Sequence, residues 1–207
     1  HERMLMPVPA NLDLAQAAAV PEVFLTAYDA VFVQSGLQMG ESVLIHAVGS
    51  GVGTAAVQMA RAQSSRTFGT AGSDEKIHRA KTLGLDVGIN YHTQDFAEVV
   101  ERETGGRGVD VLLDVIGAPY WAQNMKSMAM KGRMIIVGSM GGGTVDQMSI
   151  GAIQSKRLTL RGTMLRSRPL EEKATLVQTF VQRIVPLLAN GTVQPVVDRV
   201  FGFDDIA

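Results

Sequence analysis

The sequence predicts an α/β fold built on a doubly wound parallel sheet, and three observations support that prediction. Short apolar runs of strand length alternate with amphipathic runs of helix length, at intervals of about 20 to 30 residues. A glycine cluster directly follows the apolar run 43–48, and residues with helical spacing follow the glycines. Glycines also stand where two later strands are expected to end, at 114–117 and 137–143. This arrangement is typical of parallel sheets that carry helices on both faces.

Two helices are expected before the first strand. Residues 14–19 form a short candidate helix with Asp13 as its cap. Residues 21–34 have apolar side chains at helical spacing and begin with a proline, which suits the first turn of a helix. The apolar run 43–48, bounded by glycines, then predicts a buried parallel strand.

The rest of the chain continues this alternation. Further strands are expected at residues 66–72, 87–90, 109–114, 133–137, 157–164 and 196–201. Helices are expected at residues 54–61, between Ser73 and Gly84, and at 95–104, 120–130 and 171–189, with Pro186 in the last turns of the final one. Residues 204–205 resemble the beginning of another helix.

The glycine turn after the first strand predicts a dinucleotide phosphate site. Its residues Ser50, Gly51, Val52 and Gly53 lie between a strand and a helix, in a G-x-G-x-G pattern that begins at Gly49. Glycine lets the backbone turn sharply and approach a pyrophosphate, and the helix N-terminus offers unpaired N–H groups to the anion. The strand, turn and helix together indicate a Rossmann-type cofactor domain.

The tip of the second strand favours NADPH over NADH. An acidic residue at this tip would bond the 2′-hydroxyl of NADH, but Gly72 stands about 19 residues after the glycine turn, where that acid is expected. Lys76, one helical turn further on, is placed to meet a 2′-phosphate, and Tyr91 is placed beside the adenine. The alternative is that Ser73 only caps a helix and Lys76 is a solvated lysine. The neighbouring acids, residues 74–75, argue against a phosphate.

Ligands of open parallel sheets bind beyond the carboxyl ends of the strands. Residues 114–117 and the loop containing Gly138, Ser139 and Met140 are therefore expected at the nicotinamide end of the cofactor. Residues 165–168 add two arginines at the same edge. Either one of them contacts the cofactor or both are surface residues, and the second interpretation explains them at least as well.

Other chemistry-bearing side chains give weaker signals. His46 is expected to be a core histidine inside the central strand, and His78 and His92 are expected to be exposed. The pair 120–121, Tyr-Trp, is either the wall of an aromatic pocket or core packing. No catalytic triad or carboxylate pair emerges, which leaves Ser50 as the catalytic candidate.

The composition excludes several classes of protein. The chain has 207 residues, 46% of them hydrophobic, and a formal charge of −1, so nothing in the charge balance favours nucleic acid or anionic membrane partners. No apolar run approaches the roughly 18 residues of a membrane span. Cysteine is absent, which removes disulfides and thiolate metal sites from this sequence. We expect a cytoplasmic globular protein.

Many segments of the chain resemble the medium-chain dehydrogenase/reductase superfamily. Within it they are similar to the quinone oxidoreductase branch and, through Tyr120, Trp121, Asn124 and the glycines from 141, to its tumour-suppressor-inducible members. The segments that carry the resemblance are residues 5–9, 16–22, 25–28, 43–47, 50–56, 95–96, 114–117 and 165–168. The resemblance implies an enzyme that passes hydride from NADPH to a quinone or a conjugated carbonyl.

The resemblance also assigns roles to residues. It implies phosphate contacts at Ser50, Gly51, Val52 and Gly53, 2′-phosphate contacts at Ser73, Lys76 and Tyr91 beside Gly72, and nicotinamide-side contacts at Gly138, Ser139 and Met140. The zinc enzymes of the superfamily carry a cysteine near the position of Glu22, and this sequence has none, which argues against catalytic zinc.

The resemblance further implies a division into parts. Residues 1–20 would be the tail of a GroES-like catalytic domain and a linker, 21–190 the cofactor domain, and 191–207 a return segment. We therefore expect the chain to be cut from a longer protein, and we expect a homodimer that forms through the edge strand at 158–164.

Two alternatives remain open. The chain is either catalytic or a non-catalytic NADPH-binding module. A methyltransferase would share the glycine turn, but it would carry an acid where Gly72 stands.

Overall fold

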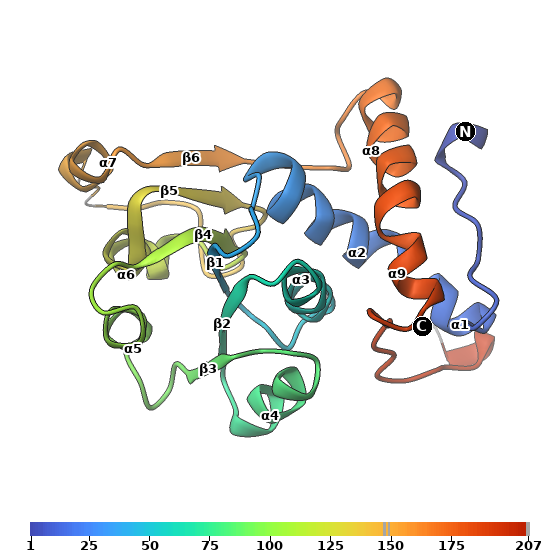
Figure 1. Cartoon of the computed structure of the whole chain (residues 1–207), viewed down its shortest axis with the longest axis horizontal. Coiled ribbons are helices and arrows are strands. Elements are labelled where there is room, and N and C mark those ends of the chain that lie inside the picture. The colour runs from blue at the N-terminus through green and yellow to red at the C-terminus, as the bar shows by residue number, and fades with distance from the viewer. Residues whose placement is uncertain (147, 149, 206–207) are drawn as a thin grey trace.

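The computed structural model describes residues 1–146, 148 and 150–205, which form an α/β fold around a parallel sheet (Figure 1). The six strands of the described residues are ordered β3-β2-β1-β4-β5-β6, and every neighbouring pair is parallel. They are β1 (Ser42–Ile45), β2 (Arg66–Ala71), β3 (Val87–Asn90), β4 (Val109–Asp114), β5 (Met128–Ile136) and β6 (Thr159–Gly162). The chain winds outward from β1 in one direction and then from β4 in the other, which confirms the predicted doubly wound sheet.

Helices cover both faces of this sheet. The helices of the described residues, of which some lie beyond the sheet, are α1 (Leu14–Ala18), α2 (Pro21–Tyr28), α3 (Gly51–Ala62), α4 (Asp74–Thr82), α5 (Phe96–Glu103), α6 (Trp121–Ser127), α7 (Ile150–Lys156), α8 (Leu170–Arg183) and α9 (Val185–Ala189). Shorter turns are η1 (Glu2–Met4), the π-helical η2 (Asp29–Gln34), η3 (Ala118–Tyr120) and η4 (Phe203–Asp205). Asp13 caps α1 through a capping box with Gln16, as predicted.

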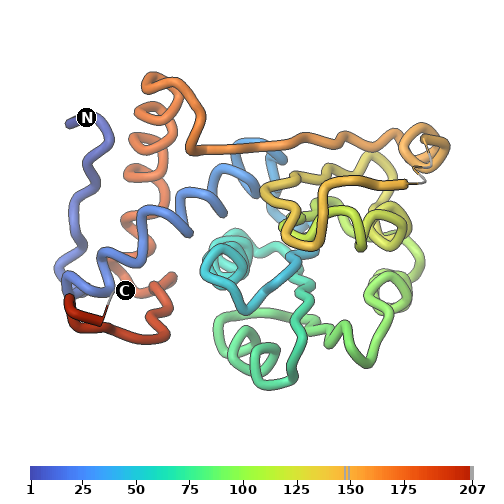
Figure 2. Tube along the Cα trace, turned by 180° about the vertical axis from the view of Figure 1, so that it is seen from behind, coloured from blue at the N-terminus to red at the C-terminus, as the bar shows by residue number. Residues whose placement is uncertain are grey.

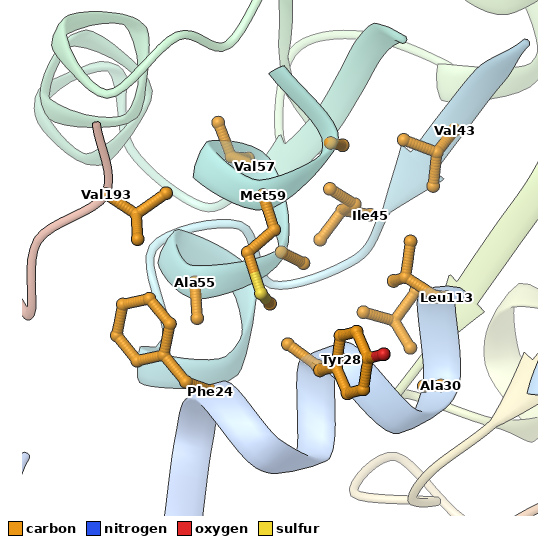
Figure 3. Packing of buried hydrophobic residues seen from close by; sticks show 14 of the residues in the cluster. Phe24, Tyr28, Ala30, Val43, Ile45, Ala55, Val57, Met59, Leu113 and Val193 are labelled. Atoms are coloured by element: carbon orange, nitrogen blue, oxygen red, sulfur yellow. The ribbon is translucent and has the colours of Figure 1, made fainter. Parts of the chain in front are cut away.

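Alternate residues of the central strands β1, β4 and β5 supply two separate cores, one on each face of the sheet. Ile45 of β1 faces the larger cluster, where Phe24 and Tyr28 of α2 pack against Met59 of α3 (Figure 3). Leu44 faces the opposite way, into a second cluster that includes residues of α5 and α6. The continuous apolar run of β1 is therefore explained by burial on both faces.

The segments near the two chain ends lie side by side, beyond the sheet (Figure 2). Arg3 of η1 forms a two-fold hydrogen bond with Glu171 of α8, with N–O distances of 2.7 and 2.6 Å. The Asn11 amide donates to the Leu188 carbonyl of α9 at 2.9 Å. Residues 1–12 are thus held on α8 and α9 rather than on the sheet.

Several predicted elements differ from the structure. The helix predicted at 21–34 becomes π-helical from Asp29, and the helix predicted at 171–189 breaks at Ile184, two residues before Pro186. The helix predicted at 120–130 ends at Ser127, because β5 already begins at Met128. The strand predicted at 196–201 was wrong, since these residues form no strand, and α7 was not predicted.

Candidate functional site

A cleft of about 430 Å³ opens at the carboxyl edge of the sheet, where the chain reverses its winding between β1 and β4. Residues from the ends of five strands line it: Ala47, Gly49, Ser50, Ala71, Gly72, Lys76, Tyr91, Ile116, Tyr120, Met140 and Gly141. A hollow of about 520 Å³ lies between α2 and α8, but it contains no part of the glycine turn. The cleft brings together five predicted site residues: Ser50, Gly72, Lys76, Tyr91 and Met140.

The turn after β1 is built differently from the prediction. The strand ends at Ile45, and Gly51 to Gly53 form the first turn of α3 rather than a separate loop. Ser50 caps this helix, because its Oγ accepts the Gly53 amide at 3.1 Å. Within the described residues, the amides of Gly51 and Val52 have no recorded acceptor, so two N–H donors stand at the helix terminus beside the cleft.

The two glycines of this helical turn allow close packing. A Cβ at Gly53 would lie 2.5 Å from the Ala47 carbonyl oxygen, and one at Gly51 would lie 2.7 Å from a methyl group of Val23. Both distances are shorter than a van der Waals contact. Glycine at 53 therefore holds α3 tightly against the end of β1, which places the helix terminus at the cleft.

The tip of β2 gathers the predicted 2′-phosphate residues. A Cβ at Gly72 would lie 2.5 Å from the Tyr91 hydroxyl, so glycine leaves the room that the Tyr91 ring occupies. The aliphatic part of Lys76 crosses over Gly49, since a Cβ there would lie 3.2 to 3.3 Å from the Lys76 carbons. Ser73 does not line the cleft, and its Oγ accepts the Lys76 amide at 3.4 Å as the cap of α4.

The two acids beside this tip are bound elsewhere. Asp74 accepts a hydrogen bond from the Asn90 side chain at 2.9 Å. Glu75 pairs with Arg79 one turn along α4, with an N–O distance of 2.8 Å. No ion pair recorded within the described residues uses Lys76. Lys76 is therefore the basic residue among those that line the cleft at this tip.

Two loops close the far side of the cleft, after β4 and β5. The Met140 amide donates to Val115 at 3.1 Å, and the Gly141 amide donates to Ile116 at 2.8 Å. Gly117 has a φ of +87°, and a Cβ there would lie 2.5 Å from the Gly142 carbonyl oxygen. Met140 and Gly141 line the cleft, whereas Gly138 and Ser139 do not.

Tyr120 forms an aromatic wall of the cleft. Its ring lies 4.8 Å from the His46 ring, 5.0 Å from Phe96 and 6.2 Å from Tyr91, measured between ring centroids. Burial, with smaller effects from Tyr91 and Asp114, raises the pKa of the Tyr120 hydroxyl to about 12. Each of the two interpretations of the Tyr-Trp pair holds for one residue: Tyr120 lines the cleft, and Trp121 packs against the second core.

His46 is a core histidine, as predicted, but it lies one residue after β1 rather than inside it. Its ring hydrogen-bonds Thr70 and Asn124, at 3.0 and 2.7 Å. Burial lowers the pKa of His46, and the hydrogen bond with Asn124 and the charge of Asp114 oppose this only in part. His78 and His92 are exposed, as predicted.

The arginines after β6 are not cleft residues. Arg168 forms a two-fold hydrogen bond with the buried Asp29 of η2, at 2.8 and 2.5 Å, and also contacts Thr163. Arg166 is exposed. The guanidinium group of Arg168 is thus bound to the carboxylate of Asp29. The hypothesis that one of these arginines contacts the cofactor gains no support.

Comparison with known proteins identifies the family. A family model described as zinc-binding dehydrogenase matches residues 51–182. The chain belongs to that family. Rat quinone oxidoreductase is 29% identical over 201 residues, which are 97% of this chain and 59% of the rat protein. Such relatives place the chain in the quinone oxidoreductase branch of the medium-chain dehydrogenase/reductase superfamily.

Solved structures of related proteins share this fold but differ in the function that their titles give. JamJ enoyl reductase superposes with a TM-score of 0.82 at 28% identity, covering 98% of this chain and 60% of the reductase. An NAD-dependent alcohol dehydrogenase has a TM-score of 0.79 at 35% identity, covering 92% and 52% of the two chains. The chain therefore spans a little over half the length of these two relatives, and the two are named for different reactions.

The sequence of this family member contains no cysteine. Within residues 1–146, 148 and 150–205, no three histidine, aspartate or glutamate side chains are grouped as metal ligands. Nor is any described helix long and apolar enough to cross a membrane.

Sequence reasoning gave no role to Ala47, which lines the cleft. Ala47 has a φ of +50°, in the left-handed region that alanine rarely adopts, and its residue type gave no sign of this. Ile116 and Gly141 also line the cleft, and both lie in the strand-end segments 114–117 and 137–143 that the sequence singled out.

Proposed function

We propose that this chain is the cofactor half of a zinc-independent reductase, which binds NADPH and passes its hydride to a quinone or a conjugated carbonyl. The observation that carries the proposal is the cleft, in which a helix N-terminus with two unpartnered amides faces a strand tip with a lysine and no acid. The first feature suits a diphosphate and the second suits a 2′-phosphate.

The preference for NADPH is argued from charge. Lys76 lines the cleft, while Asp74 and Glu75 are held by Asn90 and Arg79. The Tyr91 hydroxyl lies next to Gly72 and supplies a neutral donor at the same tip. A ribose phosphate at this tip would meet one cation and one hydroxyl, whereas a free 2′-hydroxyl would find no carboxylate to bond.

The catalytic part of the proposal rests on the family and on chemistry. Bound NADPH supplies a hydride, and the loops after β4 and β5, including Met140 with its neighbours Gly138 and Ser139, would hold the nicotinamide end. An electron-poor acceptor needs chiefly positioning by the protein. Ser50 caps α3 in this structure, so we assign it to the phosphate side rather than to the chemistry.

The assembly around this half is also proposed. Residues 1–20 and 191–207 would join a GroES-like catalytic domain, and 21–190 would be the cofactor domain of a cytoplasmic homodimer. Support comes from the chain's coverage of 59% of rat quinone oxidoreductase. β6 lies at one of the two open edges of the sheet among the described strands, and it is the edge at which we propose that a second copy pairs.

Titration of the chain with NADPH and with NADH tests the cofactor. We expect NADPH to bind at least tenfold more tightly, because a charge-assisted hydrogen bond contributes about 1.5–3 kcal/mol. Lys76→Met should remove most of this preference and leave NADH binding unchanged. Lys81→Met, at an exposed position of the same helix, is the matched control and should behave like the wild type. Equal affinities of the wild type for the two cofactors would contradict the proposal.

A second measurement separates an enzyme from a non-catalytic NADPH-binding module. A quinone or an enone is added to the NADPH-bound chain, and the absorbance of the reduced cofactor is followed. If the chain is catalytic, the absorbance falls as hydride passes from NADPH to the acceptor. Stable absorbance with both acceptors, despite tight NADPH binding, would favour the binding module.

A further inference from the structure

His46 lies directly behind the cleft, at a point where three strand ends meet. It follows β1, its amide donates to the Leu113 carbonyl of β4 at 3.1 Å, and its Nδ1 contacts Thr70 of β2. The side chain is 1% exposed and does not line the cleft. The proposed function gives this buried titratable group no role.

Asp114 fixes the direction of the hydrogen bonds around His46. One carboxylate oxygen accepts the amides of Ile116 and Gly117, at 2.7 and 3.0 Å, and the other accepts Asn124 Nδ2 at 3.2 Å. The Asn124 side chain therefore turns its oxygen toward His46 Nε2, 2.7 Å away. An oxygen there accepts, so Nε2 carries the proton, and Nδ1 accepts the Thr70 hydroxyl. Both ring nitrogens are satisfied in this neutral tautomer.

The same network is connected to two residues of the cleft wall. The amide of Ile116 is held by Asp114, and the ring of Tyr120 packs edge-on against the His46 ring at 4.8 Å and 70°. Tyr120 and Ile116 both line the cleft, near Tyr91 at the tip of β3. This is the side on which the adenosine ribose is placed by Gly72 and Lys76.

We propose that His46 is a positioning residue for nucleotide binding: as the Nε2-protonated neutral imidazole, it anchors Asn124 and holds Tyr120 as the wall against which the purine packs. The inference rests on the proposed function, because it takes the ligand of the cleft to be an adenine dinucleotide. His46 acts through Tyr120 and Asn124 and contacts no part of the ligand itself.

Three variants of the full chain test this role by NADPH titration. His46→Leu leaves the Asn124 oxygen buried without a donor, and we expect the dissociation constant to rise about tenfold. His46→Gln places an N–H near the position of Nε2 and should stay within threefold of the wild type. Thr67→Val is the matched control: Thr67 of β2 is also fully buried, but its hydroxyl group bonds Gly84 and Asp86 rather than His46. It should bind NADPH within twofold of the wild type.

Two results of the titration would overturn the inference. One is wild-type affinity in His46→Leu, and the other is a loss in Thr67→Val as large as that in His46→Leu, which would indicate general loosening of the core. The variants' folding is checked by circular dichroism.

Nitrogen-15 NMR of the His46 imidazole tests the inference on the wild-type protein, so it does not depend on whether a variant folds. At pH 7 we expect the Nε2–H tautomer, and we expect added NADPH to shift the ring signals without changing that tautomer. A protonated ring, the Nδ1–H tautomer, or signals that NADPH leaves unchanged while it binds would each contradict the inference. If the wild type does not bind NADPH, the proposed function fails, whereas the tautomer still decides whether the network is assigned correctly.

Discussion

At the scale of single residues, the site depends on positions where only a small side chain fits. Gly53 faces main-chain atoms, with a Cβ position 2.5 Å from the Ala47 oxygen and 2.7 Å from the Val48 Cα. Main-chain atoms cannot move aside as a flexible side chain can. The contact at Gly53 therefore fixes the distance between α3 and the end of β1.

Gly53→Ala should consequently destabilise the fold by about 1–3 kcal/mol, the usual cost of overpacking, and should weaken NADPH binding. Gly162→Ala is the matched control, because a Cβ there meets nothing within 4 Å, and its effect should stay within about 0.5 kcal/mol. Chemical denaturation of both variants measures the difference. Equal stability of the two variants would show that α3 is not held by this contact.

Residue types revealed some of these roles and concealed others. The glycine pattern, and glycine rather than an acid at position 72, could be recognised in the sequence. The structure brings Gly72, Lys76 and Tyr91 to one cleft. The capping role of Ser50 and the left-handed backbone conformation of Ala47 could not be predicted, because both depend on where β1 ends. A shift of two or three residues in a strand boundary changes which residue caps the next helix.

At the scale of elements, α6 and α7 are joined by one lysine. Lys156 Nζ donates to the carbonyls of Met125, Lys126 and Met128, at 2.8 to 2.9 Å. A cation at the carboxyl end of a helix satisfies orphan carbonyl groups and interacts favourably with the helix dipole. This contact gives two carbonyls of the last turn of α6, those of Met125 and Lys126, a donor where the predicted helix 120–130 ends early at Ser127.

Lys156→Met keeps the length of the side chain but removes the three hydrogen bonds, and we expect a loss of about 1–3 kcal/mol in the free energy of unfolding. Lys126→Met provides the comparison, since Lys126 is exposed and pairs only with the exposed Glu101. Its stability should be close to that of the wild type. Thermal or chemical denaturation distinguishes the two, and a stable Lys156→Met variant would refute the bridging role.

A second inter-element contact predicts a dependence on pH. Glu41, before β1, forms a two-fold hydrogen bond with Arg133 of β5. Burial raises the pKa of the Glu41 carboxyl, but the hydrogen bonds from Arg133 and Gln38 and the charges of Arg133 and Arg107 outweigh it. The net pKa is lowered from the ordinary value of 4.5. The folded state thus binds this proton more weakly than the unfolded state.

The pair should therefore stabilise the fold fully above about pH 4.5 and lose its contribution as the pH falls through the lowered pKa. Glu41→Gln should be less stable than the wild type by about 1 kcal/mol at pH 7, and the difference should shrink toward zero at low pH. Urea denaturation across this pH range measures it, with Glu22→Gln, an exposed carboxyl, as the control. A difference that stays constant with pH would contradict the assignment.

At the scale of the whole molecule, the sheet was predictable and its surroundings were less so. Apolar runs in the sequence predict buried strands such as β1 and β4, and the order of the strands follows from the doubly wound pattern. Residues 196–201 have the composition of a strand, but the structure gives them no neighbouring strand to pair with. α7 is short and has no buried residue, so no periodic apolar face marked it. Pairing partners and marginal helices are set by tertiary context.

The proposed function requires the cleft at the carboxyl edge of the sheet to bind a diphosphate and a 2′-phosphate together. A crystal structure of the chain with NADPH tests this claim most directly. The account predicts the diphosphate at Ser50 and the first amides of α3, and the 2′-phosphate between Lys76 and Tyr91. A nucleotide bound away from the carboxyl edge of the sheet, or one whose 2′-phosphate points away from Lys76, would contradict it.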